Sequence, residues 1–141
     1  MDPAIDNALA ITPASTARDR TVDITTIGAR TGRARRIEVW FYRVDGQIFL
    51  TTQPARRSWY ANILANPSFT FHLKHNVRAD LPAIGIPVRD PRRREAVFRS
   101  VIADLEQSWN PAGIPQPVEP LQQRMDGSPL IHVEFTEGPI S

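Results

Sequence analysis

The sequence predicts an antiparallel β-barrel with peripheral helices, a fold of the mainly β or α+β class. Six segments alternate apolar and polar residues as strands do: 21–27, 35–43, 47–52, 68–74, 77–88 and 130–135. Tight turns or single helices connect them, so the repeated strand–helix–strand pattern of a parallel sheet is missing. The 141 residues suffice for one hydrophobic core. We expect one domain over residues 21–141, preceded by an arm or short helix at residues 1–20.

The first three strands are predicted to follow one another as a meander. Residues 28–32 begin and end with glycine and supply the first turn, and Val44-Asp-Gly46 supplies the second. The segment 68–74 shows the strictest alternation in the chain. The segment 77–88 contains Pro82 and Pro87, and since proline cannot donate to a ladder, we expect this strand at an edge or a bulge.

Two helices are expected around the barrel. Ser58 can cap a short helix that Pro67 ends, and Asp90-Pro91 has the order of an N-cap followed by a first-turn proline. An apolar stripe then predicts a helix over 91–108. Residues 110–120 contain four prolines and are expected to form a loop.

Composition excludes several classes of protein. The absence of cysteine rules out disulfides, thiol catalysis and cysteine-bound metals. No apolar run approaches the roughly 20 residues that span a bilayer, and the N-terminus lacks the apolar core of a signal peptide. We therefore expect a cytoplasmic protein that is not an integral membrane protein.

The positive charge of this chain is local. Lys and Arg number 17 against 15 Asp and Glu, a net charge of +2, yet two short segments hold six arginines: Arg30, Arg33, Arg35, Arg36, Arg56 and Arg57. Such clustering favours one anion site over general binding of polyanions. Nucleic-acid binding is not expected, because the net charge is small and no series of aromatic residues accompanies the arginines.

The first arginine group sits on the predicted hairpin turn. Four arginines between positions 30 and 36 repel one another unless an anion lies among them, which favours a ligand over a solvated basic turn. Arg56 and Arg57 precede a helix N-terminus, where free N–H groups also favour an anion. Simple surface exposure is an equal alternative for Arg56 and Arg57.

Other polar residues lie close to these arginines in sequence. Thr51 and Thr52 end the third strand and can offer a hydroxyl to a cofactor, although strand propensity explains them equally well. Trp59 and Asn62 share one face of the short helix, where they either line the site or pack on the barrel and cap backbone. Glu38 can accept a hydrogen bond from a cofactor ring or pair with a neighbouring arginine.

No metal site or familiar catalytic motif is predicted. His72, His75 and His132 do not form a ligand set, because the first two are expected on opposite faces of one strand. The sequence shows no Ser-His-Asp order, P-loop or dinucleotide-binding glycine pattern. No catalytic residue is assigned.

Three segments in order resemble the deazaflavin-dependent nitroreductase family. They are Thr25-Thr-Ile-Gly-Ala-Arg-Thr-Gly-Arg-Ala-Arg35, the Asp45-Gly46 turn, and Trp59-Tyr-Ala-Asn-Ile-Leu-Ala-Asn-Pro67 with the alternating strand after it. The resemblance covers residues 22–76 well, and the later strand, helix and last strand agree in order. It implies a split β-barrel related to the barrels that bind flavin mononucleotide (FMN).

The resemblance also implies a cofactor and an activity. The family's hydride donor is reduced coenzyme F420, whose phosphodiester and oligoglutamate tail carry several negative charges. Arginines suit such a tail because guanidinium binds phosphate and carboxylate in bidentate geometry. Arg30 and Arg35 match the family's basic positions. The expected reaction is hydride transfer to a small electrophile such as a quinone, a nitroaromatic compound or an activated alkene.

Two alternatives share the fold. An FMN-binding reductase would need fewer arginines for its shorter tail, and a non-catalytic carrier of a cofactor, haem or fatty acid would need no acceptor. Split barrels often pair, so the resemblance also allows for a homodimer.

Overall fold

The structure is a computed structural model that describes residues 1–52, 58–105 and 126–138. Its elements in chain order are α1 (Pro3–Leu9), α2 (Ala17–Arg20), β1 (Thr21–Ile27), β2 (Ala34–Val44), β3 (Gln47–Thr51), α3 (Ser58–Ala65), β4 (Ser68–Leu73), β5 (Ala79–Pro87), α4 (Pro91–Leu105) and β6 (Leu130–Phe135). The predicted loop at 110–120, the end of the helix predicted to reach 108, and the predicted anion ligands Arg56 and Arg57 lie outside the described residues.

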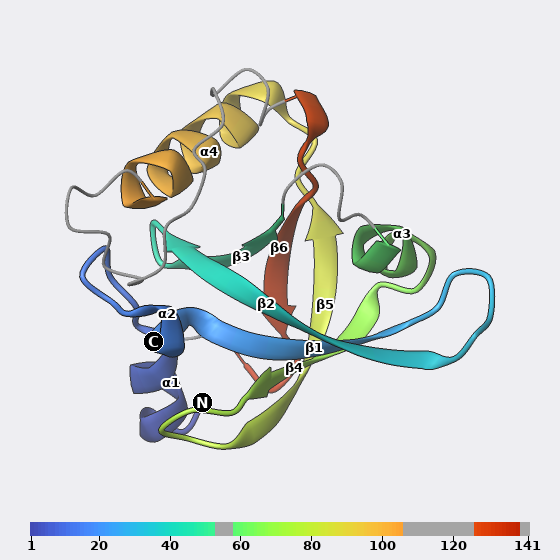
Figure 1. Cartoon of the computed structure of the whole chain (residues 1–141), viewed down its shortest axis with the longest axis horizontal. Coiled ribbons are helices and arrows are strands. Elements are labelled where there is room, and N and C mark those ends of the chain that lie inside the picture. Colours follow the sequence, from blue (N-terminus) through green and yellow to red (C-terminus); the bar gives the residue numbers. More distant parts are fainter. Residues whose placement is uncertain (53–57, 106–125, 139–141) are drawn as a thin grey trace.

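The six strands form a closed barrel in the order β1-β2-β3-β6-β5-β4, and every pair is antiparallel (Figure 1). This confirms the predicted fold class. Strands β1, β2 and β3 follow one another as the expected meander. The helices lie around the barrel, with α4 and the pair α1 and α2 at different ends of Figure 1.

The predicted edge position of the proline-containing strand is wrong. β5 pairs with both β4 and β6, so it lies inside the closed sheet. Pro82 is tolerated because it stands opposite Thr136, one residue beyond the last β5–β6 pair, where its carbonyl accepts the Thr136 N–H at 3.0 Å. The bond that proline cannot make is therefore one at the end of the ladder.

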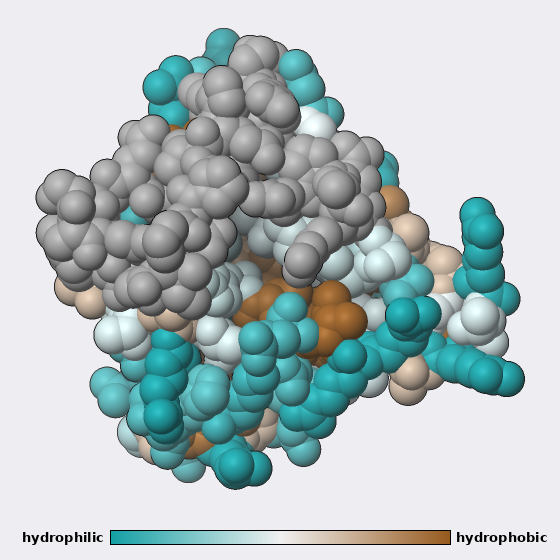
Figure 2. Space-filling model, viewed as in Figure 1, coloured by the Kyte–Doolittle hydropathy of each residue, from teal (hydrophilic) through white to brown (hydrophobic). Residues whose placement is uncertain are grey.

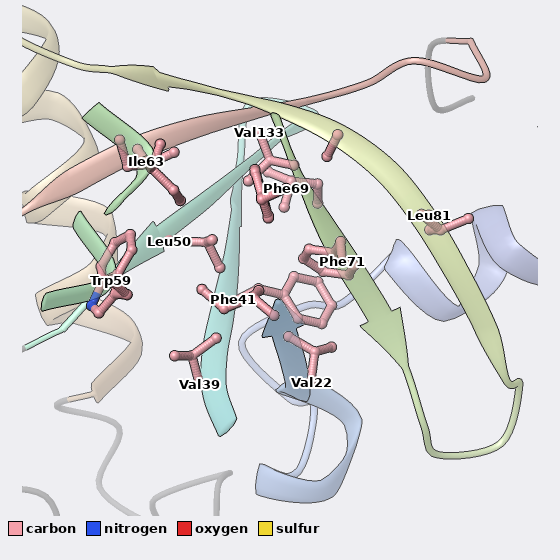
Figure 3. Packing of buried hydrophobic residues seen from close by; sticks show 14 of the residues in the cluster. Val22, Val39, Phe41, Leu50, Trp59, Ile63, Phe69, Phe71, Leu81 and Val133 are labelled. Carbon is pink, nitrogen blue, oxygen red and sulfur yellow. The ribbon is translucent and has the colours of Figure 1, made fainter. Parts of the chain in front are cut away.

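Inward-facing side chains of all six strands fill the barrel (Figure 3). Phe41 and Phe71 are fully buried and meet edge to face, with ring centroids 5.5 Å apart. Helix α3 adds Trp59 and Ile63 to this core, and α1 adds Leu9. Gly85 on β5 permits the close approach of α3, because a Cβ there would come within 2.5 Å of Ile63.

A second apolar cluster lies between α4 and the outer surface of the barrel. Its buried members are Tyr42, Phe49, Val88, Val97, Phe98, Val101 and Leu130. Asp90 caps α4 as predicted, accepting the Arg93 N–H at 3.1 Å ahead of Pro91. Arg20 of α2 is buried and pairs with Asp104, which links the N-terminal segment to α4.

Candidate functional site

The ends of β1 and β2 project from the barrel as a hairpin (Figure 1). Its turn is closed by the Gly28 N–H, which donates to the Arg33 carbonyl at 2.8 Å, and by the Gly32 N–H, which donates to the Gly28 carbonyl at 2.9 Å. Gly32 has φ 68°, a left-handed conformation that favours glycine. The glycines of the first predicted turn therefore hold the arginine-bearing segment in a compact loop.

The hairpin arginines divide into two groups. Arg30, Arg33 and Arg35 are exposed, and their side chains have no hydrogen-bond or ion-pair partner within the described residues. Arg36 instead points to the opposite face of β2 and pairs with Asp23 at 2.9 Å. Arg35 stands opposite the buried Thr26 in the β1–β2 ladder, so it lies on the face that meets α3.

Helix α3 is fixed to the barrel through two of the predicted site residues. The Trp59 indole N–H donates to the Thr52 hydroxyl at 3.0 Å, and the Asn62 amide donates to the Thr26 hydroxyl at 3.1 Å. The Asn62 carbonyl oxygen also accepts the Ala29 N–H at 2.9 Å. The side chains of Trp59 and Asn62 are both buried, so they act on the site by holding α3 against the barrel.

An apolar surface separates these arginines from the body of the barrel. Ile37 and Val39 follow Arg35 on the same face of β2, where Ile37 is half-buried and packs on the core. Figure 2 shows a hydrophobic patch near the centre of its view, over the middle of β2 as Figure 1 draws it, with hydrophilic side chains toward the hairpin. The face of β2 that carries Arg35 thus combines an apolar floor, formed by Ile37, with cations that have no partner among the described residues.

Two predicted cofactor contacts lie elsewhere. Thr51 is buried and its hydroxyl donates to the Pro129 carbonyl at 2.6 Å. Glu38 lies on the outer face of β2 and pairs with Lys74, rather than with an arginine. Strand alternation places Glu38 on the opposite face from Arg35 and Ile37, so it does not lie on the face that carries the apolar floor.

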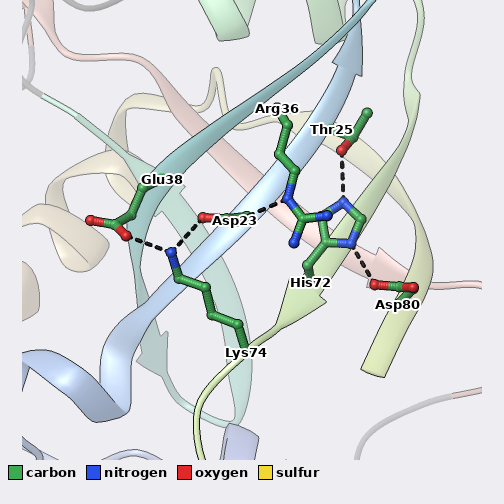
Figure 4. Close-up of polar contacts among 7 residues, drawn as sticks. All are labelled: Asp23, Thr25, Arg36, Glu38, His72, Lys74 and Asp80. Carbon is green, nitrogen blue, oxygen red and sulfur yellow. Dashed lines mark hydrogen bonds and ion pairs between the residues drawn. The ribbon is translucent and has the colours of Figure 1, made fainter. Parts of the chain in front are cut away.

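Lys74, the only lysine of the chain, joins two carboxylates on that outer face (Figure 4). Its ammonium lies 2.7 Å from Asp23 and also pairs with Glu38. Burial alone would raise the pKa of Asp23, but hydrogen bonds from Lys74 and Arg36 outweigh it and hold that pKa below its ordinary value. Burial likewise opposes the charge of Lys74, and its two carboxylate partners raise its pKa. Arg36 and Lys74 are therefore both paired with carboxylates in this cluster.

A relay of three residues lies beside this network and was missed from the sequence. Thr25 hydrogen-bonds to His72 Nε2 at 2.7 Å, and His72 Nδ1 bonds to Asp80 at 2.6 Å (Figure 4). A neutral imidazole protonated on Nδ1 satisfies both contacts, and the bond from His72 lowers the pKa of Asp80. Thr25 pairs with both β2 and β4, so it lies inside the sheet.

The described residues hold no group of three or more His, Asp or Glu side chains suited to a metal ion. His75 follows β4 in the turn to β5, so the expectation that His72 and His75 share one strand is wrong. None of the described helices is long and apolar enough to cross a membrane.

This chain is similar in fold to several solved structures. The conserved hypothetical protein Rv2991 from Mycobacterium tuberculosis is 20% identical with a TM-score of 0.64, over 96% of this chain and 81% of that one. The haem storage protein HutZ from Vibrio cholerae is 17% identical with a TM-score of 0.54, over 86% and 87% of the two chains. An F420-H2 dependent reductase, FDR-A, is 16% identical with a TM-score of 0.51, over 82% and 94%.

No curated protein matches the sequence. The sequence model of one family does match, over residues 15–115, which include the arginine hairpin, α3 and five of the six strands. That family is described as F420H(2)-dependent quinone reductase. Its match spans more than two thirds of the 141 residues and confirms the resemblance to deazaflavin-dependent reductases. The chain belongs to the F420H(2)-dependent quinone reductase family.

Proposed function

We propose that this protein is a reductase that uses reduced coenzyme F420 to transfer a hydride to a small electrophile such as a quinone, a nitroaromatic compound or an activated alkene. Family membership supports the cofactor, and FDR-A, a protein of similar fold, is described as a reductase dependent on it. The observation that carries the proposal is a set of three arginines beside an apolar floor, none of which has a side-chain partner among the described residues.

The residues present fit this cofactor. Its tail carries phosphodiester and carboxylate groups, and Arg30, Arg33 and Arg35 are cations without carboxylate partners among the described residues. The aromatic ring system requires an apolar surface, which the half-buried Ile37 supplies on the same face of β2 as Arg35. Arg56 and Arg57 stay predicted ligands of the tail, since they precede α3 in sequence.

In this mechanism the protein binds and orients, while the cofactor supplies the hydride when bound. Trp59 and Asn62 fix α3 against the barrel, and the arginines hold the anionic tail at the hairpin. The apolar floor excludes water from the reacting ring. Arg36, Glu38 and Thr51 have protein partners and are not proposed as ligands.

The test is a titration followed by turnover. The purified protein should quench or shift the fluorescence of F420 with saturation, and a soluble quinone should then oxidise the reduced cofactor only when the protein is present. Tight binding without oxidation would indicate a carrier of the cofactor. Saturable binding of FMN in place of F420 would assign the protein to the flavin barrels. A cytoplasmic location and a homodimer remain further predictions.

A further inference from the structure

The arginine hairpin extends beyond the support of the barrel. β1 pairs with β4 only at Asp23, Ile24 and Thr25, whereas its pairing with β2 continues to Ile27. Past Thr25 the ribbon therefore has two strands, and no third strand of the described residues pairs with it. A two-stranded ribbon is marginally stable by itself in water, so its position depends on contacts from outside the ladder.

Asn62 supplies such contacts from α3. Its amide group donates to Thr26, the first residue of β1 without a β4 partner, and its carbonyl oxygen accepts from Ala29 in the turn. Ala29 lies beyond the last ladder pair, Ile27–Ala34, so its N–H is not used in the sheet. One side chain thus holds the ribbon at its base and at its turn.

Burial makes the bond between Asn62 and Thr26 effective. Asn62 is 8% exposed and Thr26 is 1% exposed, so water cannot easily replace either partner, whereas Ala29 is exposed. A buried amide or hydroxyl that loses its partner is left unsatisfied, which favours keeping the contact closed. The ribbon is therefore held in one orientation relative to α3.

The positive charges of the ribbon oppose its fixed orientation relative to α3. Arg30, Arg33 and Arg35 are exposed like charges close in sequence, and Arg35 lies directly across from the Thr26 that Asn62 binds. Their mutual repulsion favours a wider distribution of ribbon positions when no anion is present. The link from Asn62 to Thr26 and Ala29 keeps the arginine-bearing turn at a fixed distance from α3.

We propose that Asn62 is a positioning residue that sets the arginine hairpin at the correct distance from α3 for an anionic chain extending from a ring bound beside that helix. The inference rests on the proposed function for the nature of the ligand. Asn62 acts through Thr26 and Ala29 and does not itself bind the anion. The sequence left open whether this residue lines the site or packs on the barrel and caps backbone, and the structure shows its side chain bonded to Thr26 and Ala29.

The experiment compares ligands with and without the anionic tail. Affinities for F420 and for the same deazaflavin carrying a ribityl chain but no phosphate are measured by fluorescence titration. The variants are Asn62→Ala, the milder Thr26→Val, which removes one of the two bonds, and the control Asn66→Ala, at the position after α3. Asn66 offers the same amide without a side-chain hydrogen bond to the hairpin among the described residues.

We expect Asn62→Ala to reduce the affinity advantage of F420 over the tail-less compound by about tenfold, within the usual range of coupling between contacting residues. Thr26→Val should reduce it less, and Asn66→Ala should leave it unchanged. In an Arg35→Ala background the effect of Asn62→Ala should shrink, because one of the positioned groups is gone. An equal loss for both ligands, or an unchanged ratio, would overturn the inference.

A second readout is independent of the cofactor. Binding of inorganic tripolyphosphate should weaken in Asn62→Ala, and hydrogen exchange of the amides at 28–33 should accelerate in the folded protein. If the unmodified protein binds tripolyphosphate but not F420, the proposed function fails while the positioning role is still tested. Unchanged exchange and unchanged tripolyphosphate binding would exclude that role.

Discussion

Arg35 and Arg36 are adjacent in sequence but serve opposite faces of β2. Arg36 pairs with Asp23 at 2.9 Å on the outer face, whereas Arg35 stands opposite Thr26 on the face that meets α3 and has no partner among the described side chains. Both are exposed and carry the same charge, so they differ mainly in direction. Substituting Arg35 and Arg36 in turn therefore distinguishes an anion site with directional contacts from a general effect of positive charge.

We expect Arg35→Ala to weaken F420 binding by about 1.5–3 kcal/mol, the contribution of a hydrogen bond to a charged group. Arg36→Ala removes the same charge but should change affinity less than about twofold, because only its long-range field is lost and salt screens it. Fluorescence titrations at two salt concentrations measure both effects. Equal losses in the two variants would mean that the hairpin attracts anions without directional contacts.

Trp59→Phe should lower the free energy of unfolding by roughly 1 kcal/mol, because it removes the indole N–H donor to Thr52 while keeping an aromatic ring in the core. Chemical denaturation checks this value. Trp40→Phe is the control, since Trp40 is half-buried outside the barrel core and no hydrogen bond of its side chain occurs among the described residues. A larger loss in the control would contradict the role given to the Trp59–Thr52 bond.

The pKa of Asp23 gives stability a defined dependence on pH. Its folded pKa lies below the ordinary 3.8, so its contribution is present above that value and is lost as pH falls through the folded pKa. We expect Asp23→Asn to unfold more easily at pH 7 and to show a flatter loss of stability between about pH 5 and pH 2. Urea denaturation across that range measures the slope. Parallel pH profiles would show that Asp23 has the same pKa in both states.

Local patterns predicted the elements of this fold, whereas partners distant in sequence were not predictable. The alternation in 68–74 and 130–135 located β4 and β6 to within a residue. The position of Pro82 at the end of a ladder depends on β6, more than 40 residues away in sequence, so the sequence suggested an edge instead.

In the candidate site, too, local features were predictable and partners distant in sequence were not. Glycines and arginines at 28–36 predicted the hairpin and its charge, and alternation could have assigned Arg35 and Arg36 to different faces. Glu38 on β2 finds its partner Lys74 just after β4, and Asn62 on α3 finds its partner Thr26 on β1, so folding of the barrel brings each pair together. The Thr25–His72–Asp80 relay spans β1, β4 and β5 for the same reason.

Selectivity between F420 and FMN provides the remaining prediction. Arg30, Arg33 and Arg35 extend along the projecting hairpin, so a long polyanionic tail gains contacts that the single phosphate of FMN does not reach. We expect F420 to bind at least about tenfold more tightly, a difference of about 1.4 kcal/mol that one additional charged contact supplies. Competition titrations with the two cofactors measure the ratio. Arg30→Ala should lower it, because Arg30 is in the turn, while Arg36→Ala should preserve it. A preference for FMN, or an F420-to-FMN affinity ratio that Arg30→Ala leaves unchanged, would mean that the hairpin does not bind the anionic tail.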